Sequence, residues 1–294
     1  MKVFILALDG LSHELVNLWN LKYLKQEQHG FIPSIINRKH EEPLSPQVWG
    51  SFITGRVQDI DDWQVYTKPM SWIRWNTPIR RIRGSSWLIG KTFGRRILIP
   101  VLNLIKHQKK YVTNEILNGV PIFDIVSDSI AVNVPLYNLD SEWLFGCTRK
   151  ILEGDTDAFQ KHVTDNTGLM IQETFRRMPE NWNLFMTWIP IADQMGHVFV
   201  SRKRKMREVY GNLNMLAYNI SSKLEDDCLM VIISDHGIKI SSDGISGCHS
   251  NNAFYSFNRK VDWKPKKITD FYDFIKSVVP SNQVLETLTH HARA

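Results

Sequence analysis

The chain has 294 residues, of which 43% are hydrophobic and 22% are charged, a composition typical of a soluble globular protein. This length permits one large α/β domain or two smaller domains. The three cysteines, Cys147, Cys228 and Cys248, have no CxxC spacing, which argues against a disulfide framework and against a thiolate zinc site. No apolar run reaches the roughly 18 residues that a membrane span requires, so we expect a soluble, cytoplasmic protein.

The first residues, MKVFILALDG, predict a buried strand over residues 2–8. The apolar run is too short for a signal sequence or a membrane span, and it ends at Asp9-Gly10. A helix is expected to begin near Ser12, because Ser is a favoured residue before the first helical turn.

The segment LSPQVWGSFITG, residues 44–55, places Ser45 directly before Pro46. Ser is a favoured N-cap and Pro a favoured first helical residue, which predicts that Ser45 caps a helix. The alternative interpretation is a nucleophile at the N-terminus of that helix. The two interpretations are compatible, because the helix dipole favours negative charge that develops at this end.

Residues 64–120 are rich in Trp and Arg, and we interpret them as a basic insertion or lid. From Gln64 to Asn114 there are eleven Lys or Arg residues and no Asp or Glu, although the net charge of the whole chain is only +6. This asymmetry indicates an anionic partner, whether nucleic acid, a phosphorylated substrate or a membrane surface. A solvated basic insertion explains it equally well. Residues 138–180 are interpreted as a second excursion or cap segment.

Three further apolar runs predict strands over residues 128–137, 183–191 and 227–237. Patterns with helical spacing precede these runs. Continuous apolar strands separated by helices favour a mainly parallel central sheet with helices on both faces. We therefore predict that residues 1–294 form a single α/β domain that carries the basic insertion.

Polar residues follow three of the four predicted strands. They are Asp9, then Asp193 with His197, then Asp235 with His236. In a parallel sheet these strand ends lie along one edge, where open α/β sheets bind their ligands. Taken singly, Asp9 reads as a turn residue and Asp193 as a helix cap. An adjacent Asp and His after an apolar strand are harder to explain, because both are costly to bury without partners.

His249, in the segment GCHS, completes a set of three carboxylates, three histidines and Ser45. Carboxylate oxygens and imidazole nitrogens suit zinc, with manganese or iron as alternatives. Seven ligands are too many for one tetrahedral ion, but they match two ions about 4 Å apart that share a nucleophile. A bound ion would also lower the pKa of the Ser45 hydroxyl and so activate it.

The motifs, taken in order, resemble those of the alkaline phosphatase superfamily, and most closely those of the type I phosphodiesterase/nucleotide pyrophosphatase family. The segment LALDGL is similar to the family's first metal-bearing strand end, and LSPQVWGSFITG to its nucleophile segment. The unit IFDIVSDSIAVNVPLY resembles a helix and strand of the family. The segments ADQMGH, IISDHG and GCHS resemble the later metal-binding motifs of the family. The resemblance extends over nearly the whole chain and implies an alkaline phosphatase-like fold.

The resemblance also implies site residues. It implies two divalent metal ions in two ligand sets, the first comprising Asp193, His197 and His249 and the second Asp9, Asp235 and His236. Ser45 would bridge toward the second ion and attack phosphorus, forming a covalent phosphoryl or nucleotidyl enzyme. Because Pro46 has no amide hydrogen to donate, transition-state charge would fall mainly on the metals.

We therefore predict a two-metal phosphoesterase that hydrolyses phosphodiesters or nucleotide pyrophosphates. The alternative is a protein that binds nucleic acid or an anionic membrane through residues 64–113, on a weakly active or inactive hydrolase scaffold. The complete ligand set favours the enzyme. Tyr66 stands where the family usually has a phosphate-binding Asn, and Tyr66, Trp72 and Trp75 are the candidate substrate-binding residues, the indoles as surfaces on which a base could stack.

Overall fold

A computed structural model of the chain describes residues 1–60, 116–139 and 155–280. The chain divides into two compact units, and the larger comprises Met1–Asp59, Leu117–Leu139 and Thr167–Ala294. The smaller comprises Ile60–Ile116 and Asp140–Asn166. Each helix in the described ranges is either too short or too polar to cross a membrane.

Several predicted features lie outside the described residues. They include Tyr66, Trp72 and Trp75, the whole of the basic segment 64–113 and residues 140–154 of the predicted second excursion. Within that excursion the structure describes α9, a helix over Thr156–Arg177. The division into a domain, an insertion and a cap therefore stays a prediction.

A six-stranded sheet in the order β2-β8-β5-β1-β4-β3 forms the centre of the larger unit. Its strands are β1 Val3–Leu8, β2 Gln28–Pro33, β3 Ser129–Val132, β4 Leu184–Ile189, β5 Leu229–Ile233 and β8 Asn252–Phe257. Strand β1 pairs in parallel with β4 and β5, and β3 pairs in parallel with β4. Within this sheet β8 runs opposite to the other strands and pairs in antiparallel fashion with β5 and β2. The prediction of a mainly parallel sheet is confirmed.

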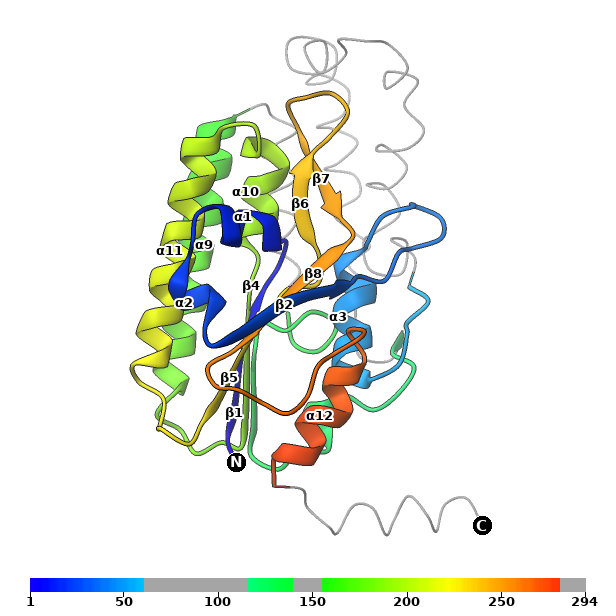
Figure 1. The fold of residues 1–294 in the computed structure, drawn as a ribbon, viewed down its shortest axis with the longest axis vertical. Coiled ribbons are helices and arrows are strands. Elements are labelled where there is room, and N and C mark those ends of the chain that lie inside the picture. The colour runs from blue at the N-terminus through cyan, green and yellow to red at the C-terminus, as the bar shows by residue number, and fades with distance from the viewer. Residues whose placement is uncertain (61–115, 140–154, 281–294) are drawn as a thin grey trace, which may run out of the picture. The chain divides into compact units, whose positions relative to one another are not determined.

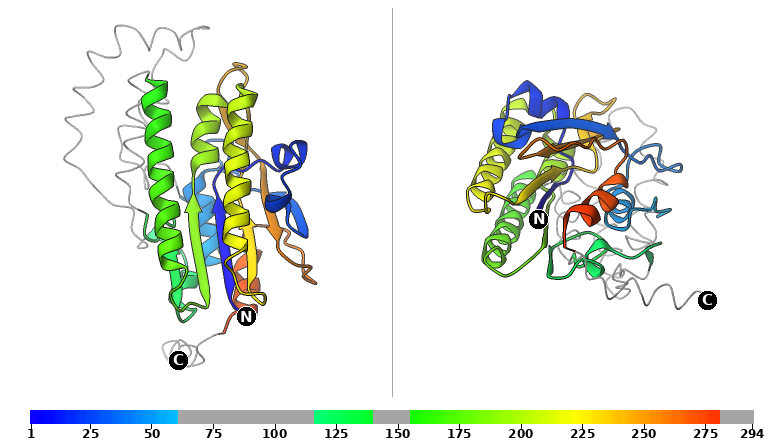
Figure 2. Two further views of the ribbon diagram at one scale, coloured as in Figure 1. Left: turned by 90° about the vertical axis from the view of Figure 1, so that its left-hand side faces the viewer. Right: turned by 60° about the horizontal axis from the view of Figure 1, so that its bottom comes forward.

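Helices cover both faces of this sheet. The described helices are α1 His13–Leu18, α2 Lys22–Lys25, α3 Ser45–Thr54, α9, α10 Ile191–Phe199, α11 Lys203–Ser221 and α12 Asp270–Val278, with a 3-10 turn, η4, at Ile122–Asp124. Helix α11 and the part of α9 that belongs to this unit lie on one face, and α3 and α12 lie on the other (Figures 1 and 2). The predicted arrangement of helices on both faces is confirmed.

The central strands form because they are apolar along almost their whole length, with Thr187 of β4 as the exception. Every residue of β1, β4 and β5 is buried, as expected for parallel strands covered on both faces. Full burial of one Val, Leu, Ile or Phe side chain contributes about 1.5–3 kcal/mol. The three strands therefore form a rigid base for the polar residues that follow them.

The register of the sheet brings these polar residues together. Leu8 lies opposite Ile189 of β4, and Ala7 lies opposite Ile233 of β5. The amide of Asp9 donates to the carbonyl of Ile189 at 3.1 Å, so the pairing continues to the first polar residue. The residues that follow β1, β4 and β5 consequently meet at one edge of the sheet.

The strand predicted over residues 128–137 is wrong in length. Strand β3 ends at Val132, because Asn133 (φ 54°) and Leu136 (φ 61°) adopt left-handed conformations that a strand does not contain. The helical pattern before it forms only the short turn η4.

A hairpin outside the central sheet was not predicted. Its strands are β6 Gly237–Ile240 and β7 Gly247–Ser250, which pair with each other in antiparallel fashion. Each strand has four residues, too few to show an alternating pattern in the sequence. The hairpin matters for the site because β7 carries His249.

Candidate active site

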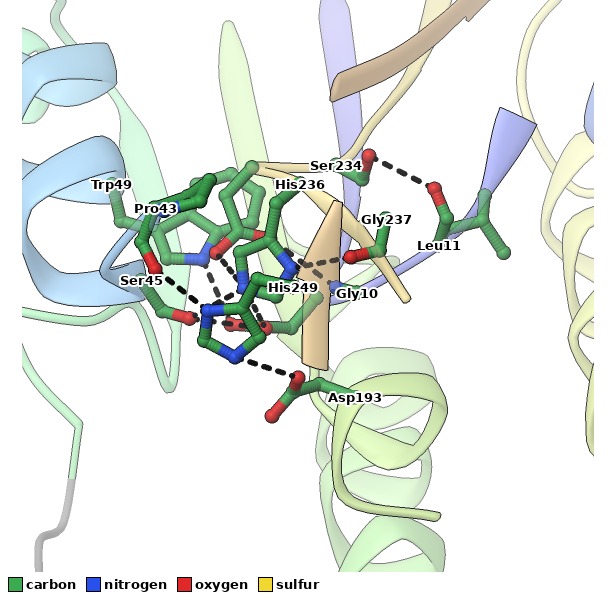
Figure 3. A network of polar contacts seen from close by, with 12 residues as sticks. Gly10, Leu11, Pro43, Ser45, Trp49, Asp193, Ser234, His236, Gly237 and His249 are labelled. Atoms are coloured by element: carbon green, nitrogen blue, oxygen red, sulfur yellow. Dashed lines mark hydrogen bonds and ion pairs between the residues drawn. The ribbon is translucent and has the colours of Figure 1, made fainter. Parts of the chain in front are cut away.

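All seven site residues predicted from the sequence lie at the carboxyl edge of the sheet. Asp9 follows β1, Ser45 begins α3, Asp193 and His197 lie on α10, Asp235 and His236 follow β5, and His249 lies on β7. Figure 3 shows Ser45, Asp193, His236 and His249 directed toward one another. They fall into two groups. The outer group is Asp193, His197 and His249; the inner group is Asp9, Asp235 and His236, next to Ser45.

Ser45 is the first residue of α3, and the N-cap is Leu44, which makes no side-chain capping bond. The prediction that Ser45 is the N-cap is therefore wrong by one residue. Its hydroxyl instead donates to Asp9 Oδ1 at 3.2 Å and lies 3.1 Å from His236 Nε2. The side chain thus points from the helix N-terminus into the inner group, where a nucleophile would be needed.

The ligand atoms of the outer group lie close together. Asp193 and His197 are four residues apart on α10 and so share one face of the helix. His197 Nε2 lies 3.1 Å from Asp193 Oδ1 and 3.0 Å from His249 Nε2, and the Asp193–His249 distance between the same atoms is 3.5 Å. One nitrogen from each imidazole and one carboxylate oxygen therefore face a common point.

In the inner group His236 Nε2 lies 3.2 Å from Asp235 Oδ2 and 3.6 Å from Asp9 Oδ1. The amide of Gly10 donates to the other oxygen of Asp235 at 3.2 Å. Asp193 also belongs near this group, because ligand atoms of Asp9, Asp193 and His236 all lie within 4.8 Å of one another. Asp193 therefore stands between the two groups.

The three histidines are held in one tautomer. Each places Nδ1 close to a backbone carbonyl: 3.1 Å for His197 and Gly247, 2.6 Å for His249 and Pro43, and 3.0 Å for His236 and Gly237. Because a carbonyl only accepts hydrogen bonds, each Nδ1 carries the proton and donates it. Each ring then directs Nε2 into the site, an arrangement typical of metal-binding histidines.

The carboxylates provide a test of whether the site fits metal ions. Asp193 Oδ1 and Asp235 Oδ2 are buried and accept no hydrogen bond from the described residues. They face Nε2 atoms at 3.1 Å and 3.2 Å, an arrangement that is repulsive unless a proton or a metal cation lies between these atoms. The residues present therefore fit divalent cations.

Burial and mutual repulsion shift the pKa values at the site. Burial raises the pKa of Asp9 well above its ordinary value, and the charges of Asp235 and Asp193 raise it further. Burial, followed by the charge of Asp193, raises the pKa of Asp235 to about 7. Burial lowers the pKa of both His236 and His249. Bound cations would offset these costs, because they stabilise both ionised carboxylates and neutral imidazoles.

Two close approaches between backbone segments set the distances in the site. A Cβ on Gly10, which has a φ of 70°, would lie 2.6 Å from the Cα of Asp193. A Cβ on Gly247 would lie 2.4 Å from the carbonyl oxygen of Gly196. Glycine at positions 196 and 247 lets the hairpin approach α10 closely enough for His249 to reach His197.

The sequence analysis missed two residues of the site, Trp49 and Trp188. Both indole nitrogens donate to Asp9 Oδ2, at 2.9 Å and 3.0 Å respectively. A signal existed for Trp49, because it follows Ser45 by four residues on α3 and so lies on the same face of the helix. Trp188 lies within the apolar run of β4 and carries no comparable signal.

The sequence matches the family described as "Type I phosphodiesterase / nucleotide pyrophosphatase" over residues 106–279, more than half of the chain. This match includes the whole outer group, Asp235 and His236. No curated protein matches the sequence.

Solved structures with weak similarity include murine ectonucleotide pyrophosphatase / phosphodiesterase 5, at 14% identity and a TM-score of 0.44. The human form of that protein has 16% identity and a TM-score of 0.40. In both cases the match covers 82% of this chain but only 58% of the relative. An alkaline phosphatase from the Antarctic bacterium TAB5 has 12% identity and a TM-score of 0.39, with coverage of 96% and 98%. On the strength of the family match, this chain belongs to the type I phosphodiesterase/nucleotide pyrophosphatase family.

Proposed function

We propose that the protein is a metal-dependent phosphoesterase that hydrolyses phosphodiester or nucleotide pyrophosphate bonds, with Ser45 as its nucleophile. The observation that carries this proposal is the position of the Ser45 hydroxyl, between Asp9 Oδ1 and His236 Nε2 at a helix N-terminus. Family membership supports the class of bond that is cleaved. It also favours the enzyme over the alternative of a nucleic-acid- or membrane-binding protein.

Two divalent cations fit the ligand sets, and zinc suits the mixture of imidazole and carboxylate, with manganese or iron as alternatives. The outer group would hold one ion. The inner group would hold the other, with Asp193 close to both. When bound, the ions supply positive charge that lowers the pKa of the Ser45 hydroxyl and neutralises charge on the phosphoryl oxygens.

The protein's own groups would then act in two displacements. Ser45 Oγ releases its proton to solvent and attacks phosphorus, so the Oγ–P bond forms while the bond from phosphorus to the leaving oxygen breaks, and that oxygen takes up a proton from solvent. A water molecule then attacks phosphorus and releases a proton to solvent, while the Oγ–P bond breaks and Ser45 Oγ takes up a proton. The N-terminus of α3 stabilises the negative charge that develops at Oγ, although Pro46 donates no hydrogen bond there.

The test is hydrolysis of chromogenic phosphate diester and monoester substrates by the purified protein with Zn²⁺ or Mn²⁺. We expect the diester to be the better substrate and Ser45→Ala to lower kcat by at least about 10³-fold, because it removes the nucleophile. Ser222→Ala, an exposed serine at the end of α11, is the matched control and should retain full activity. Acid quenching during turnover should trap a phosphorylated Ser45 that mass spectrometry detects.

Two outcomes would contradict the proposal separately. Full turnover by Ser45→Ala would eliminate the covalent route but leave the metal site in place. Turnover that persists after exhaustive chelation would eliminate the metal-dependent reaction itself.

A further inference from the structure

Asp9 is held by an unusual pair of donors. Trp49 Nε1 and Trp188 Nε1 both donate to the same oxygen, Oδ2, at 2.9 Å and 3.0 Å. A carboxylate oxygen has two in-plane lone pairs, so two indoles occupy both of them. The other oxygen, Oδ1, is the one that faces Ser45 at 3.2 Å and His236 at 3.6 Å.

The two indoles reach Asp9 from different elements. Trp188 is paired with Ala7 in the register of β4 and β1, so its side chain lies on the same face of the sheet as those of Ala7 and Asp9. Trp49 comes from α3, where it shares a helix face with Ser45 (Figure 3). One helix therefore contacts both oxygens of the carboxylate, Oδ1 through Ser45 and Oδ2 through Trp49.

Both indoles are almost completely buried, with Trp49 0% and Trp188 3% exposed, so water does not compete for Oδ2. A backbone carbonyl would satisfy a buried indole equally well. Trp182 shows this, because its Nε1 donates to the carbonyl of Met178 at 2.9 Å. The need of an indole for a partner therefore does not explain why two of them converge on one oxygen of Asp9.

We propose that Trp49 and Trp188 are positioning residues that make Asp9 a one-oxygen ligand of the inner metal ion, with Oδ1 alone directed into the site. This inference rests on the proposed function in taking Asp9 as a metal ligand. Removal of either indole leaves Oδ2 with one donor in place of two, so the carboxylate can rotate or bind through both oxygens. Loss of such supporting hydrogen bonds lowers metal affinity by about 10–100-fold in comparable sites.

The first test is titration of the metal-free protein with Zn²⁺ in competition with a chromogenic chelator. The wild type should bind two equivalents. Trp49→Phe and Trp188→Phe should each weaken one equivalent by about 10–100-fold and leave the other unchanged. Trp182→Phe is the matched control, because it also removes a buried indole with one hydrogen bond, and it should alter neither equivalent.

The second test uses the wild-type protein, so it does not depend on the folding of a variant. In ¹H–¹⁵N spectra of the wild type, Zn²⁺ should shift the indole N–H signals of Trp49 and Trp188, because an ion on Oδ1 withdraws charge from Oδ2. The signal of Trp182 should stay in place. Unmoved Trp49 and Trp188 signals would show that no ion binds Oδ1 while the indoles hold Oδ2.

The outcomes separate this inference from the proposed function. If the wild type binds no metal, both are overturned. If the wild type binds two equivalents, but neither Trp variant changes an affinity and neither indole signal moves, only the positioning role is overturned. Equal weakening of both equivalents would likewise overturn it, because that result indicates general damage to the fold.

Discussion

The outer and inner groups use similar ligands in different surroundings. In the outer group the side chains of Asp193, His197 and His249 are 16%, 28% and 10% exposed. In the inner group no side chain is more than 2% exposed. Only the outer group therefore offers ligands that solvent or a substrate can reach directly.

The support of the two groups differs as well. Backbone carbonyls orient the histidines of both groups, but the outer ligands come from α10 and a small hairpin. The inner group rests on the ends of β1 and β5, and indole donors hold Asp9. Because electrostatic interactions strengthen as water is excluded, a charge in the inner group should contribute more binding free energy than one in the outer group. Loss of an inner ligand should therefore lower activity more. The three predictions below test this difference, from the largest expected effect to the smallest.

Asp235→Ala should have the largest effect. It removes a fully buried ligand from the inner group, so we expect diesterase activity to fall by at least about 10³-fold and one of two metal equivalents to disappear. The outer equivalent should remain when zinc is titrated into the variant. Asp226→Ala, at an exposed acid before β5, is the control. Retention of both equivalents in Asp235→Ala would show that the inner group does not depend on this carboxylate.

Gly247→Ala should break the outer group alone. The added Cβ would lie 2.4 Å from the carbonyl oxygen of Gly196, which forces the hairpin away from α10 and moves His249 from His197. We expect the affinity of the outer equivalent to fall by about 10–100-fold while the inner one is unchanged. Gly211→Ala, where a Cβ meets open space in α11, is the matched control and should not weaken binding. Titration calorimetry with zinc should show a loss of affinity at the outer site only. An equal loss of affinity at both sites would show that the two sites act as one unit.

Metal removal should distinguish the outer group from the inner group through its effect on thermal stability. An ion present at 100 times its dissociation constant contributes about 2.7 kcal/mol to the free energy of unfolding. A chelator should therefore lower the melting temperature in two steps, with the more exposed outer ion leaving first. Scanning calorimetry after timed exposure to the chelator would resolve the steps. A single step would mean that the difference in exposure has no effect on release.

The sequence predicted the central part of the fold because its signals are local. The runs before Asp9 and Asp235 are apolar throughout, which indicates strands buried on both faces, and the acids mark where the strands end. Parallel pairing then places these acids along one edge. The same local rule failed at β3, where Asn133 turns the chain after four residues of strand.

The remaining features depend on contacts that no local pattern contains. The partner of Trp188 is Asp9, 179 residues earlier in the chain, and an indole inside an apolar strand reads as an ordinary core residue. The preference of Ser for the N-cap position predicted Ser45 there, whereas the N-cap is Leu44. The Ser45 hydroxyl contacts Asp9 and His236 and does not cap the helix, and these contacts form only in the folded protein.

The hairpin β6–β7 has a consequence for the order in which the protein assembles. It shares no strand with the six-stranded sheet, yet it supplies His249, whose Nδ1 donates to the carbonyl of Pro43 just before the nucleophile helix. The sheet can therefore be complete before the hairpin docks, whereas the outer group cannot. Folding would then finish at the outer group, and native-state hydrogen exchange should find the amides of the hairpin opening at lower free energy than those of β1.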